Sequence, residues 1–427
     1  MLKKALLYLL FATLALVLTA GVAAYLIVKV ALAPSPDEWP ARVKVGPVSI
    51  DVGVPTAIRL VTSSWFAPWV AGRTVNTDFG PILFGWNDPT STLELQCAPC
   101  SATVPALGEA PIRLERLRAT VRRDGGALGG TLEASPTGST PAATDGASDG
   151  ILRANWDGRL TQKALQLNIN VPDVPITRWY AVLAPGLPEL QRGRITGTFG
   201  MRAQVSLPAR TFSLQPRISQ FTVEGLGTET MVNARTSCGA PSRLTNESWL
   251  ARSVIAAEDQ RFFTHPGYDL AELMPSLESN QKAAQVERGA STLTQQLAKL
   301  LVTGGERSAE RKLRELLYAV EMEQTLGKAR ILQLYLDNAP WGPNLCGAEA
   351  AARRYFKRSA RNLEPAQAVW LATMLNNPNV AVEKWQRDGN IDAVRAKTVA
   401  EGVKGITKPQ RDALLRNVAT ARFAPPP

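Results

Sequence analysis

Histidine is almost absent from this sequence of 427 residues, where it occurs once, as His265. One histidine leaves no H-E-x-x-H zinc site and little material for a histidine-rich metal cluster. A Ser-His-Asp triad would have to use this one position. The composition therefore argues against zinc hydrolases of that type and narrows triad chemistry to a single candidate.

Cysteine is also scarce, with four residues. Cys97 and Cys100 form a C-x-x-C pair, but there is no second such pair to complete a zinc site. Nothing around the pair has the βαβ pattern of a thioredoxin-like protein, so we expect a local disulfide, with redox activity as the alternative. Cys238 and Cys346 would then be free to pair with each other. Disulfides suit an exported protein, because the exported side of a membrane is oxidising.

Long runs of lysine or arginine are missing, although the formal net charge is +11. Positive charge spread along a chain suits a protein that works beside an anionic membrane. Nucleic acid is not needed to explain this charge, and nucleic-acid binding is hard to reconcile with export. We therefore expect a membrane among the partners and no nucleic acid.

Charged residues are absent from Ala5 to Val28, a run of 24 residues with lysines on both sides. A membrane-spanning helix needs about 20 apolar residues, whereas the core of a signal peptide has about 7–15. We expect residues 1–33 to form a single-pass anchor in the cytoplasmic (inner) membrane. The leading lysines place the N-terminus in the cytoplasm and the rest of the chain on the periplasmic side. A signal peptide cleaved near Ala20 is the alternative.

The remaining chain divides by its hydrophobic periodicity. Residues 41–235 alternate apolar and polar positions between frequent turns, which predicts a β-rich accessory domain. A Ser/Thr/Gly/Ala/Pro tract at 135–150 predicts a mobile loop inside it. Helical periodicity predicts a mainly α domain at 242–385, followed at 386–427 by peripheral helices and a disordered Pro-rich tail. The expected fold class is multidomain α and β, with a transmembrane helix, a β-rich extracytoplasmic domain and a mainly helical domain.

The first cluster of chemistry-bearing residues starts at Glu258 and includes Asp259, at the end of a helix expected to begin near residue 245. Glu258 lies on the flank of that helix's apolar face, which is formed by Leu250, Val254 and Ala257. Partial burial raises the pKa of a carboxyl group and makes its ionised form a stronger base. A surface acid near a helix end is the alternative interpretation.

The second cluster runs from Gly289 to Lys299. Thr292 and Gln295 have the spacing of a capping box, so part of the cluster is a helix start. Capping does not explain its density of hydroxyl and amide groups. A helix N-terminus beside a cation suits a phosphate or sugar ligand.

The third cluster comprises Arg311, Lys312 and Glu315. These residues are spaced three and four apart, so ion pairs on one exposed helix face would explain them. Basic residues beside a carboxylate are also what a pyrophosphate leaving group requires.

Five motifs follow one another between residues 258 and 352. They are E-D-x-x-F-x-x-H-x-G (258–267), G-x-S-T-x-T-Q-Q (289–296), R-K-x-x-E (311–315), I-L-x-x-Y-L (331–336) and G-A-E-A-A-A (347–352). Together they resemble the transglycosylase domain of glycosyltransferase family 51. That domain occurs in bifunctional penicillin-binding proteins and in monofunctional peptidoglycan transglycosylases. The resemblance implies a lysozyme-like, mainly helical catalytic domain that polymerises lipid II into glycan strands and releases the polyprenyl pyrophosphate carrier.

The resemblance also implies roles for individual residues. Glu258 would take the proton from the 4-hydroxyl of the acceptor sugar, and Glu315 would help to handle the donor pyrophosphate. Residues implied to bind substrate or its pyrophosphate are Ser291, Thr292, Gln295, Gln296, Lys299, Arg311 and Lys312. Residues implied to support the motifs are Asp259, Phe262, His265, Gly267 and Gly289. A divalent cation such as Mg²⁺ near Glu315 would be consistent with this chemistry, and no organic cofactor is expected.

The sequence departs from the family pattern at Gln333, Asp337 and Leu300, where Glu, Asn and Asn are usual. We expect no transpeptidase domain, because the S-x-x-K match at Ser279 has no K-[ST]-G motif after it. The β-rich region 41–235 is additional. It is similar in places to the β repeats of AsmA-like envelope proteins, with a spacer or a docking module for cell-wall synthesis proteins as the alternatives.

Two other functions remain open at this stage. A lysozyme-like cleft with one glutamate would suit a glycan-cleaving enzyme, although a neutral polymer needs no pyrophosphate-binding cations. A catalytically weakened scaffold of the cell-wall synthesis machinery would fit Gln333 and the extra domain, although the retained acids Glu258 and Glu315 argue against it.

Overall fold

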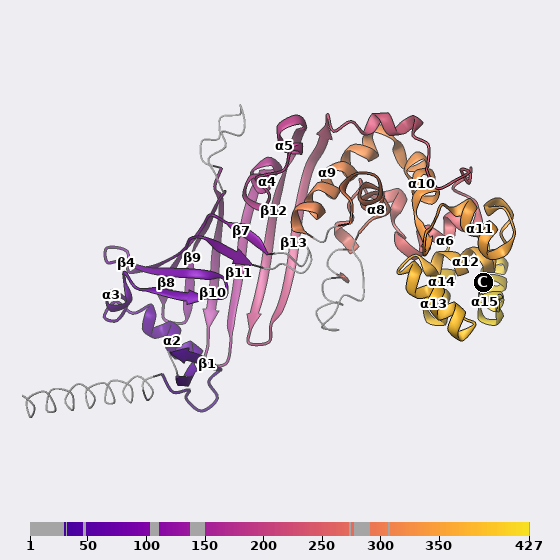
Figure 1. Cartoon of the computed structure of the whole chain (residues 1–427). Helices are drawn as coiled ribbons and strands as arrows, with labels where there is room; N and C mark the ends of the chain where they lie inside the picture. Colours follow the sequence, from indigo (N-terminus) through magenta and orange to yellow (C-terminus); the bar gives the residue numbers. More distant parts are fainter. Residues whose placement is uncertain are drawn as a thin grey trace, which may run out of the picture. The chain divides into compact units, whose positions relative to one another are not determined.

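The computed structural model describes residues 30, 32–45, 48–102, 111–136, 150–272, 275–276, 291–305 and 308–426 (Figure 1). The chain forms two compact units. The described parts of 1–102, 113–174 and 199–217 form unit 1, and those of 103–112, 175–198 and 218–427 form unit 2. Each unit therefore contains separate stretches of the sequence. Helices and sheet are both present, as the periodicity predicts.

Unit 1 is built on a nine-stranded sheet with the order β13-β12-β11-β10-β9-β8-β5-β4-β3. These strands are β3 (Thr74–Thr77), β4 (Gly80–Asn87), β5 (Thr92–Cys97), β8 (Arg116–Asp124), β9 (Ala127–Ser135), β10 (Leu152–Leu160), β11 (Leu165–Pro175), β12 (Arg194–Leu207) and β13 (Thr211–Glu224). Neighbours along the chain pair antiparallel, so that Leu160 is opposite Leu165. Small sheets pair β1 (Pro40–Val45) with β2 (Val48–Gly53) and β6 (Cys100–Ala102) with β7 (Ile112–Leu114).

The alternation of the sequence determines which face of this sheet is covered. In β10 the buried and exposed positions alternate over most of the strand. Leu128, Leu160 and Leu165 form a buried cluster, against which Trp39 and Ile58 pack. Ile58 comes from helix α2 (Val54–Val61), which is followed by the short helix α3 (Ala67–Val70). The expected mobile loop falls mostly at 137–149, outside the described residues.

Strands β12 and β13 are long, and their ends at Arg194–Thr198 and Ile218–Glu224 belong to unit 2. Unit 2 also contains helices α4 (Ile176–Leu183) and α5 (Glu189–Arg192). Periodicity predicts one β-rich domain over 41–235. In the structure, 175–198 and 218–235 belong to unit 2, and 175–198 packs on a later helix of that unit.

The remainder of unit 2 is mainly helical. Its helices are η1 (Thr228–Asn233), α6 (Trp249–Glu258), η2 (Phe262–Thr264), α8 (Leu293–Ala298), η3 (Lys299–Thr303), α9 (Ala309–Thr325), α10 (Gly327–Asn338), α11 (Ala348–Phe356), η4 (Ala360–Asn362), α12 (Pro365–Met374), α13 (Pro378–Asp388), α14 (Ala393–Gly402) and α15 (Lys408–Thr420). A small hairpin pairs β14 (Pro340–Gly342) with β15 (Leu345–Cys346). Helix α12 is apolar on most sides, and Gln367 to Met374 are all buried, so it forms the centre of the core.

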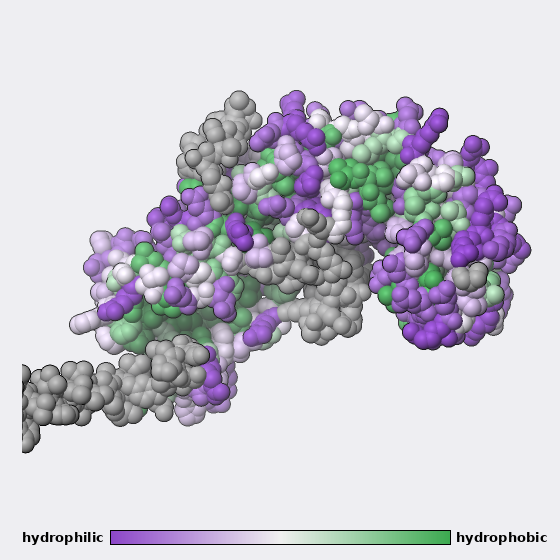
Figure 2. Space-filling view, in the orientation of Figure 1, coloured by the Kyte–Doolittle hydropathy of each residue, from purple (hydrophilic) through white to green (hydrophobic). Residues whose placement is uncertain are grey.

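The end of the chain differs from the expected disordered tail. The Trp385 indole donates a hydrogen bond to the carbonyl of Phe423, and the Phe423 ring packs edge-on against Trp370. The tail therefore covers apolar surface that the helices alone leave open. Figure 2 shows hydrophilic residues predominating on the visible surface of α13, α14 and α15.

Two disulfides join the four cysteines, Cys97 to Cys100 and Cys238 to Cys346. The second connects the segment that precedes α6 to β15. Among the described residues no helix has the length and apolar character needed to cross a membrane, and the expected span at Ala5–Val28 lies outside them.

Candidate active site

Glu258 is the last residue of α6, which begins at Trp249 rather than near residue 245. The Ser248 hydroxyl caps the helix by accepting a hydrogen bond from the backbone N–H of Ala251. The apolar face, with Leu250 and Val254, is buried. The Glu258 side chain therefore reaches the cleft from the helix's C-terminal end, with 12% of its surface exposed. Its burial raises the pKa of this carboxyl group.

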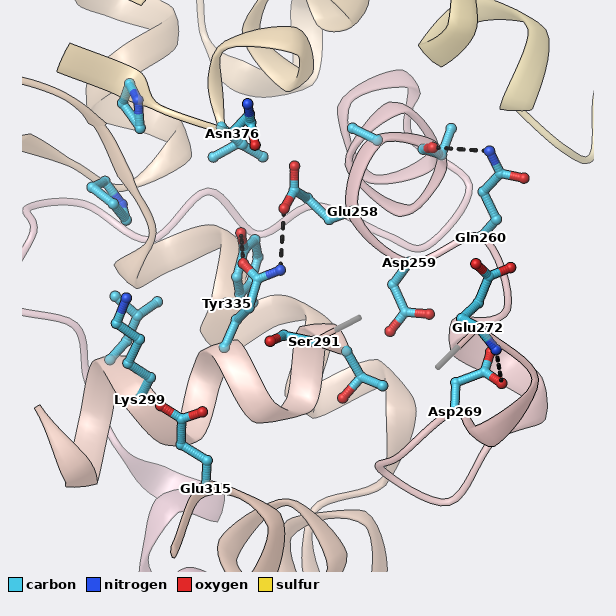
Figure 3. Close-up of a pocket in the computed structure, with 18 of the residues that line it drawn as sticks. Glu258, Asp259, Gln260, Asp269, Glu272, Ser291, Lys299, Glu315, Tyr335 and Asn376 are labelled. Atoms are coloured by element: carbon cyan, nitrogen blue, oxygen red, sulfur yellow. Dashed lines mark hydrogen bonds between the residues drawn. The ribbon is translucent and has the colours of Figure 1, made fainter. Parts of the chain in front are cut away.

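Two side chains hold the Glu258 carboxylate. Arg395 Nη2 lies 2.8 Å from Oε1, and the Gln296 amide donates to Oε2 over 3.1 Å. The Tyr335 hydroxyl in turn donates to the Gln296 carbonyl oxygen at 2.9 Å, which fixes the orientation of the amide (Figure 3). Arg395 opposes the effect of burial by lowering the pKa of Glu258, but burial is the larger effect.

Asp259 connects the first two motifs. Its carboxylate accepts a hydrogen bond from the backbone N–H of Leu293 at 2.9 Å and lies 2.9 Å from His265 Nε2. Leu293 is the first residue of α8, where free N–H groups favour a negative charge. The contact between Asp259 and His265 therefore holds the loop in place. Asp259 lines the cleft, whereas His265 does not.

Gly267 and Phe262 support the same loop. Gly267 has φ +93°, and a Cβ there would lie 2.9 Å from the Ala319 carbonyl oxygen, so a side chain is excluded. Its own carbonyl accepts a hydrogen bond from the Thr292 hydroxyl at 2.7 Å. Phe262 is fully buried, with Lys328 Nζ 4.5 Å from its ring centroid. Gly289 lies outside the described residues.

The third motif forms a buried cluster of charges on α9. Arg311 donates to Oε1 of Glu315, and Lys312 Nζ lies 3.0 Å from Oε2. Lys312 also donates to the Ser291 hydroxyl at 2.5 Å, which links the second and third motifs. Burial lowers the pKa of Lys312, and the neighbouring Arg311 and Lys299 act in the same direction, while Glu315 opposes them. Glu315 is 1% exposed, so these are not the surface ion pairs that spacing alone would suggest.

The cleft that these groups share has a volume of about 860 Å³. Predicted residues that line it are Glu258, Asp259, Ser291, Thr292, Gln296, Lys299, Arg311, Lys312 and Glu315. In Figure 3, Glu258 enters from the end of α6, whereas Lys299 and Glu315 enter together from a different side. The cleft therefore has a carboxylate with a raised pKa in one part and a group of cations in another.

Some sequence expectations need correction. Gln295 does not line the cleft, because its side chain accepts the backbone N–H of Thr292 in a capping box. Leu300 does line it. Gln333 and Asp337 do not: Gln333 accepts a hydrogen bond from Arg330, and Asp337 accepts two from Ser242. These two departures from the family pattern therefore serve the packing of the segment before α6.

The site also contains residues that the motifs did not indicate. Arg395, Thr398 and Val399 of α14 line the cleft. Periodicity predicts only peripheral helices at 386–427, whereas α14 contributes directly to the cleft. In the sequence, Arg395 is one arginine on a short helical stretch, and nothing nearby marks it as a site residue. Only the fold brings it next to Glu258.

The groups around Glu315 do not suit a divalent cation. Both carboxylate oxygens are already bonded to positively charged side chains, Arg311 and Lys312. A metal ion there would meet two neighbouring positive charges and would have to displace them. In the part of the chain that the structure describes, no group of three or more His, Cys, Asp or Glu residues is arranged to hold a metal.

Comparison with known proteins identifies the family of this chain. The family model described as "Transglycosylase" matches residues 242–404. A biosynthetic peptidoglycan transglycosylase of Thiobacillus denitrificans is 46% identical over 136 residues, covering 32% of this chain and 58% of that protein. A protein of the same name from Cupriavidus metallidurans is 39% identical over 163 residues, covering 38% of this chain and 70% of that protein. The chain spans a little over half the length of the Thiobacillus relative. With more than two thirds of the Cupriavidus protein matched at this identity, the chain belongs to the transglycosylase family.

Proposed function

We propose that this protein is a peptidoglycan glycosyltransferase that polymerises lipid II into glycan strands and releases the polyprenyl pyrophosphate carrier. The observation that carries the proposal is the division of the cleft. Glu258 has a raised pKa, and Lys299, Arg311 and Lys312 bring positive charge to the same cleft from other elements. A transfer from a sugar pyrophosphate needs a base and a group of cations at separate places.

In the proposed reaction Glu258 accepts the proton of the acceptor's 4-hydroxyl group. The hydroxyl oxygen forms a bond to the donor's anomeric carbon, while the bond from that carbon to the pyrophosphate oxygen breaks. The electron pair leaves with the pyrophosphate, whose growing negative charge is stabilised by Arg311, Lys312 and Lys299. General-base assistance of this kind contributes about 10²–10⁴ in rate. The reaction uses no organic cofactor.

The contacts in the structure support these roles. Gln296 and Arg395 each donate one hydrogen bond to a different oxygen of Glu258, which fixes the carboxylate and leaves lone pairs that can accept a proton. Ser291 and Glu315 hold Lys312, which keeps its ammonium group at the cleft although its burial opposes the charge. Lys299 is exposed and has no carboxylate partner among the described residues, so its charge is available to a phosphate.

We further propose that residues 1–33 anchor the chain in the inner membrane and that the catalytic region lies on the periplasmic side. The uncharged run at Ala5–Val28 and the disulfide between Cys238 and Cys346 support this placement. Lipid II and the growing strand are the proposed substrates. Cell-wall synthesis proteins that dock on the β-rich region are proposed partners.

The test is polymerisation of purified lipid II by the full-length protein and by Glu258→Gln. Glu247→Gln is the matched control, because Glu247 is an exposed acid two residues before the same helix. We expect long glycan strands from the wild type and the control, and a loss of about 10²–10⁴ in rate for Glu258→Gln. A parallel incubation with finished glycan distinguishes a lytic enzyme, since cleavage there without polymerisation of lipid II would contradict the proposal.

A further inference from the structure

Glu189, in the segment Pro175–Thr198 of unit 2, is a fully buried acid outside the catalytic motifs. Its Oε1 atom accepts hydrogen bonds from Arg314 Nε at 3.0 Å and Nη2 at 2.9 Å. The Tyr318 hydroxyl donates to the same oxygen at 3.2 Å. Burying a carboxylate is costly unless it is paired and hydrogen-bonded, so the position of Glu189 depends on these partners.

Both partners are on α9, the helix that carries the phosphate-side residues. Arg314 lies within the R-K-x-x-E motif, immediately before Glu315. Tyr180, which is 2% exposed, donates from its hydroxyl to the carbonyl of Leu313 at 3.0 Å. Two consecutive residues of the motif are therefore held by the segment Pro175–Thr198.

The contacts continue along one face of α9. Glu321 accepts the backbone N–H groups of Leu226 at 2.6 Å and Thr228 at 3.2 Å. Positions 314, 318 and 321 are spaced at four and three residues, so they form one stripe beside the stripe that faces the cleft. Rotation of α9 about its axis would break all of these contacts and would also move Arg311, Lys312 and Glu315.

A buried ion pair adds little to stability relative to apolar packing, but it specifies one arrangement, because any other arrangement leaves a charge unpaired. Catalytic groups must be held to within about 0.5 Å of their working positions. The Glu189–Arg314 pair can hold α9 in one orientation at the R-K-x-x-E motif, which carries such groups.

We propose that Glu189 is a positioning residue, through which the segment Pro175–Thr198 fixes the rotation of α9 and with it the phosphate-side group of Arg311, Lys312 and Glu315. Only the expected effect on the rate of polymerisation rests on the proposed function. The structural consequence, a correctly placed anion site, can be measured without turnover.

The experiment compares the full-length wild type with Glu189→Gln, Glu189→Ala, Arg314→Gln and the double variant Glu189→Gln/Arg314→Gln. Asp173→Asn is the matched control, because it removes the charge from another Arg–carboxylate pair, with Arg217, that does not involve α9. Binding of farnesyl pyrophosphate, the probe for a pyrophosphate on a prenyl chain, is measured by calorimetry. The kcat and KM for lipid II and the Tm are measured in parallel.

We expect Glu189→Ala to weaken probe binding about tenfold and to lower kcat about tenfold at temperatures well below its Tm. Glu189→Gln keeps a hydrogen-bond acceptor and should recover part of this loss. The double variant should be no worse than the more affected single variant, because both act on one contact. The control should match the wild type.

The proposal is overturned if the Glu189 variants lose Tm but bind the probe and turn over as the wild type does, because Glu189 would then serve stability alone. If Glu189→Ala does not fold, Glu189→Gln decides between the same two outcomes. If the wild type binds the probe but makes no polymer, the proposed function fails, and the probe affinities still decide the role of Glu189.

Discussion

Arg395 Nη2 lies 2.8 Å from Glu258 Oε1, although 137 residues separate the two along the chain. Arg395 also reaches the backbone carbonyls of Thr373 and Ala257, so its guanidinium group is fixed in place. A fixed positive charge beside a base favours the ionised form. In this site it limits, without cancelling, the effect of burial on the pKa of Glu258.

Replacing Arg395 with Met should therefore raise the pKa of Glu258 further. A base must be ionised to act, so the rate of polymerisation should rise with pH and reach its plateau at a higher pH than in the wild type. At pH 7 we expect a loss of about 10-fold or more. The measurement is the pH profile of kcat/KM, and a profile that falls uniformly without moving along the pH axis would argue against this role.

Glu258→Gln should increase stability while it lowers the rate as stated above. Because the pKa of Glu258 is raised in the folded state, its contribution to stability is fully present below the ordinary pKa of glutamate. This contribution is lost as the pH rises through the raised value. Glutamine does not ionise, so the variant does not lose stability in this way as the pH rises. We expect the Tm of Glu258→Gln to exceed that of the wild type by roughly 2–4 °C at pH 7. The difference in Tm should disappear near pH 4. Thermal unfolding across this pH range provides the measurement.

Glu315→Gln should damage the cation group. The glutamine leaves Arg311 and Lys312 without their shared negative charge, and the pKa of Lys312 should fall further, because Glu315 is what raises it. We expect a rate loss of about 10²-fold together with a lower Tm. Glu310→Gln, an exposed acid on the same helix, is the control and should be close to neutral. Equal effects of the two substitutions on rate would be inconsistent with this interpretation.

Removing the disulfide between Cys238 and Cys346 should destabilise unit 2. The bond closes a loop with a sequence separation of 108, so it restricts the unfolded chain strongly. Double replacement by serine should cost roughly 2–4 kcal/mol. The same replacement at Cys97 and Cys100, where the separation is 3, should cost less. Denaturant unfolding of the two double variants gives the comparison.

Much of this site could be predicted from the sequence because its residues lie within short motifs. The motifs that resemble the family mark Glu258, Arg311 and Glu315 as candidates, and periodicity adds only that Glu258 lies beside an apolar helix face. The burial of Glu315 could not be predicted, because the same spacing serves an exposed row of ion pairs. Arg395 was missed because it has no motif partner nearby in sequence, and only the packing of α14 brings it to Glu258.

In the fold, too, local features could be predicted from the sequence and contacts between distant residues could not. Alternation of apolar and polar residues predicted the strands, because the two faces of a strand differ in burial within a few residues. It could not show that Pro175–Thr198 belongs to unit 2, because the segment is short and its decisive feature is one buried acid. Glu189 in isolation is indistinguishable from a surface glutamate. Its partner Arg314 is 125 residues away.

Unit 2 is not a continuous stretch of sequence, since it includes Pro175–Thr198 as well as the chain from Ile218 onward. A gene fragment that starts at Ser242, where the family match begins, would omit Glu189, Tyr180 and the backbone donors to Glu321. If Glu189 positions α9 as proposed, such a fragment would keep the motifs but lose the contact that fixes the rotation of α9.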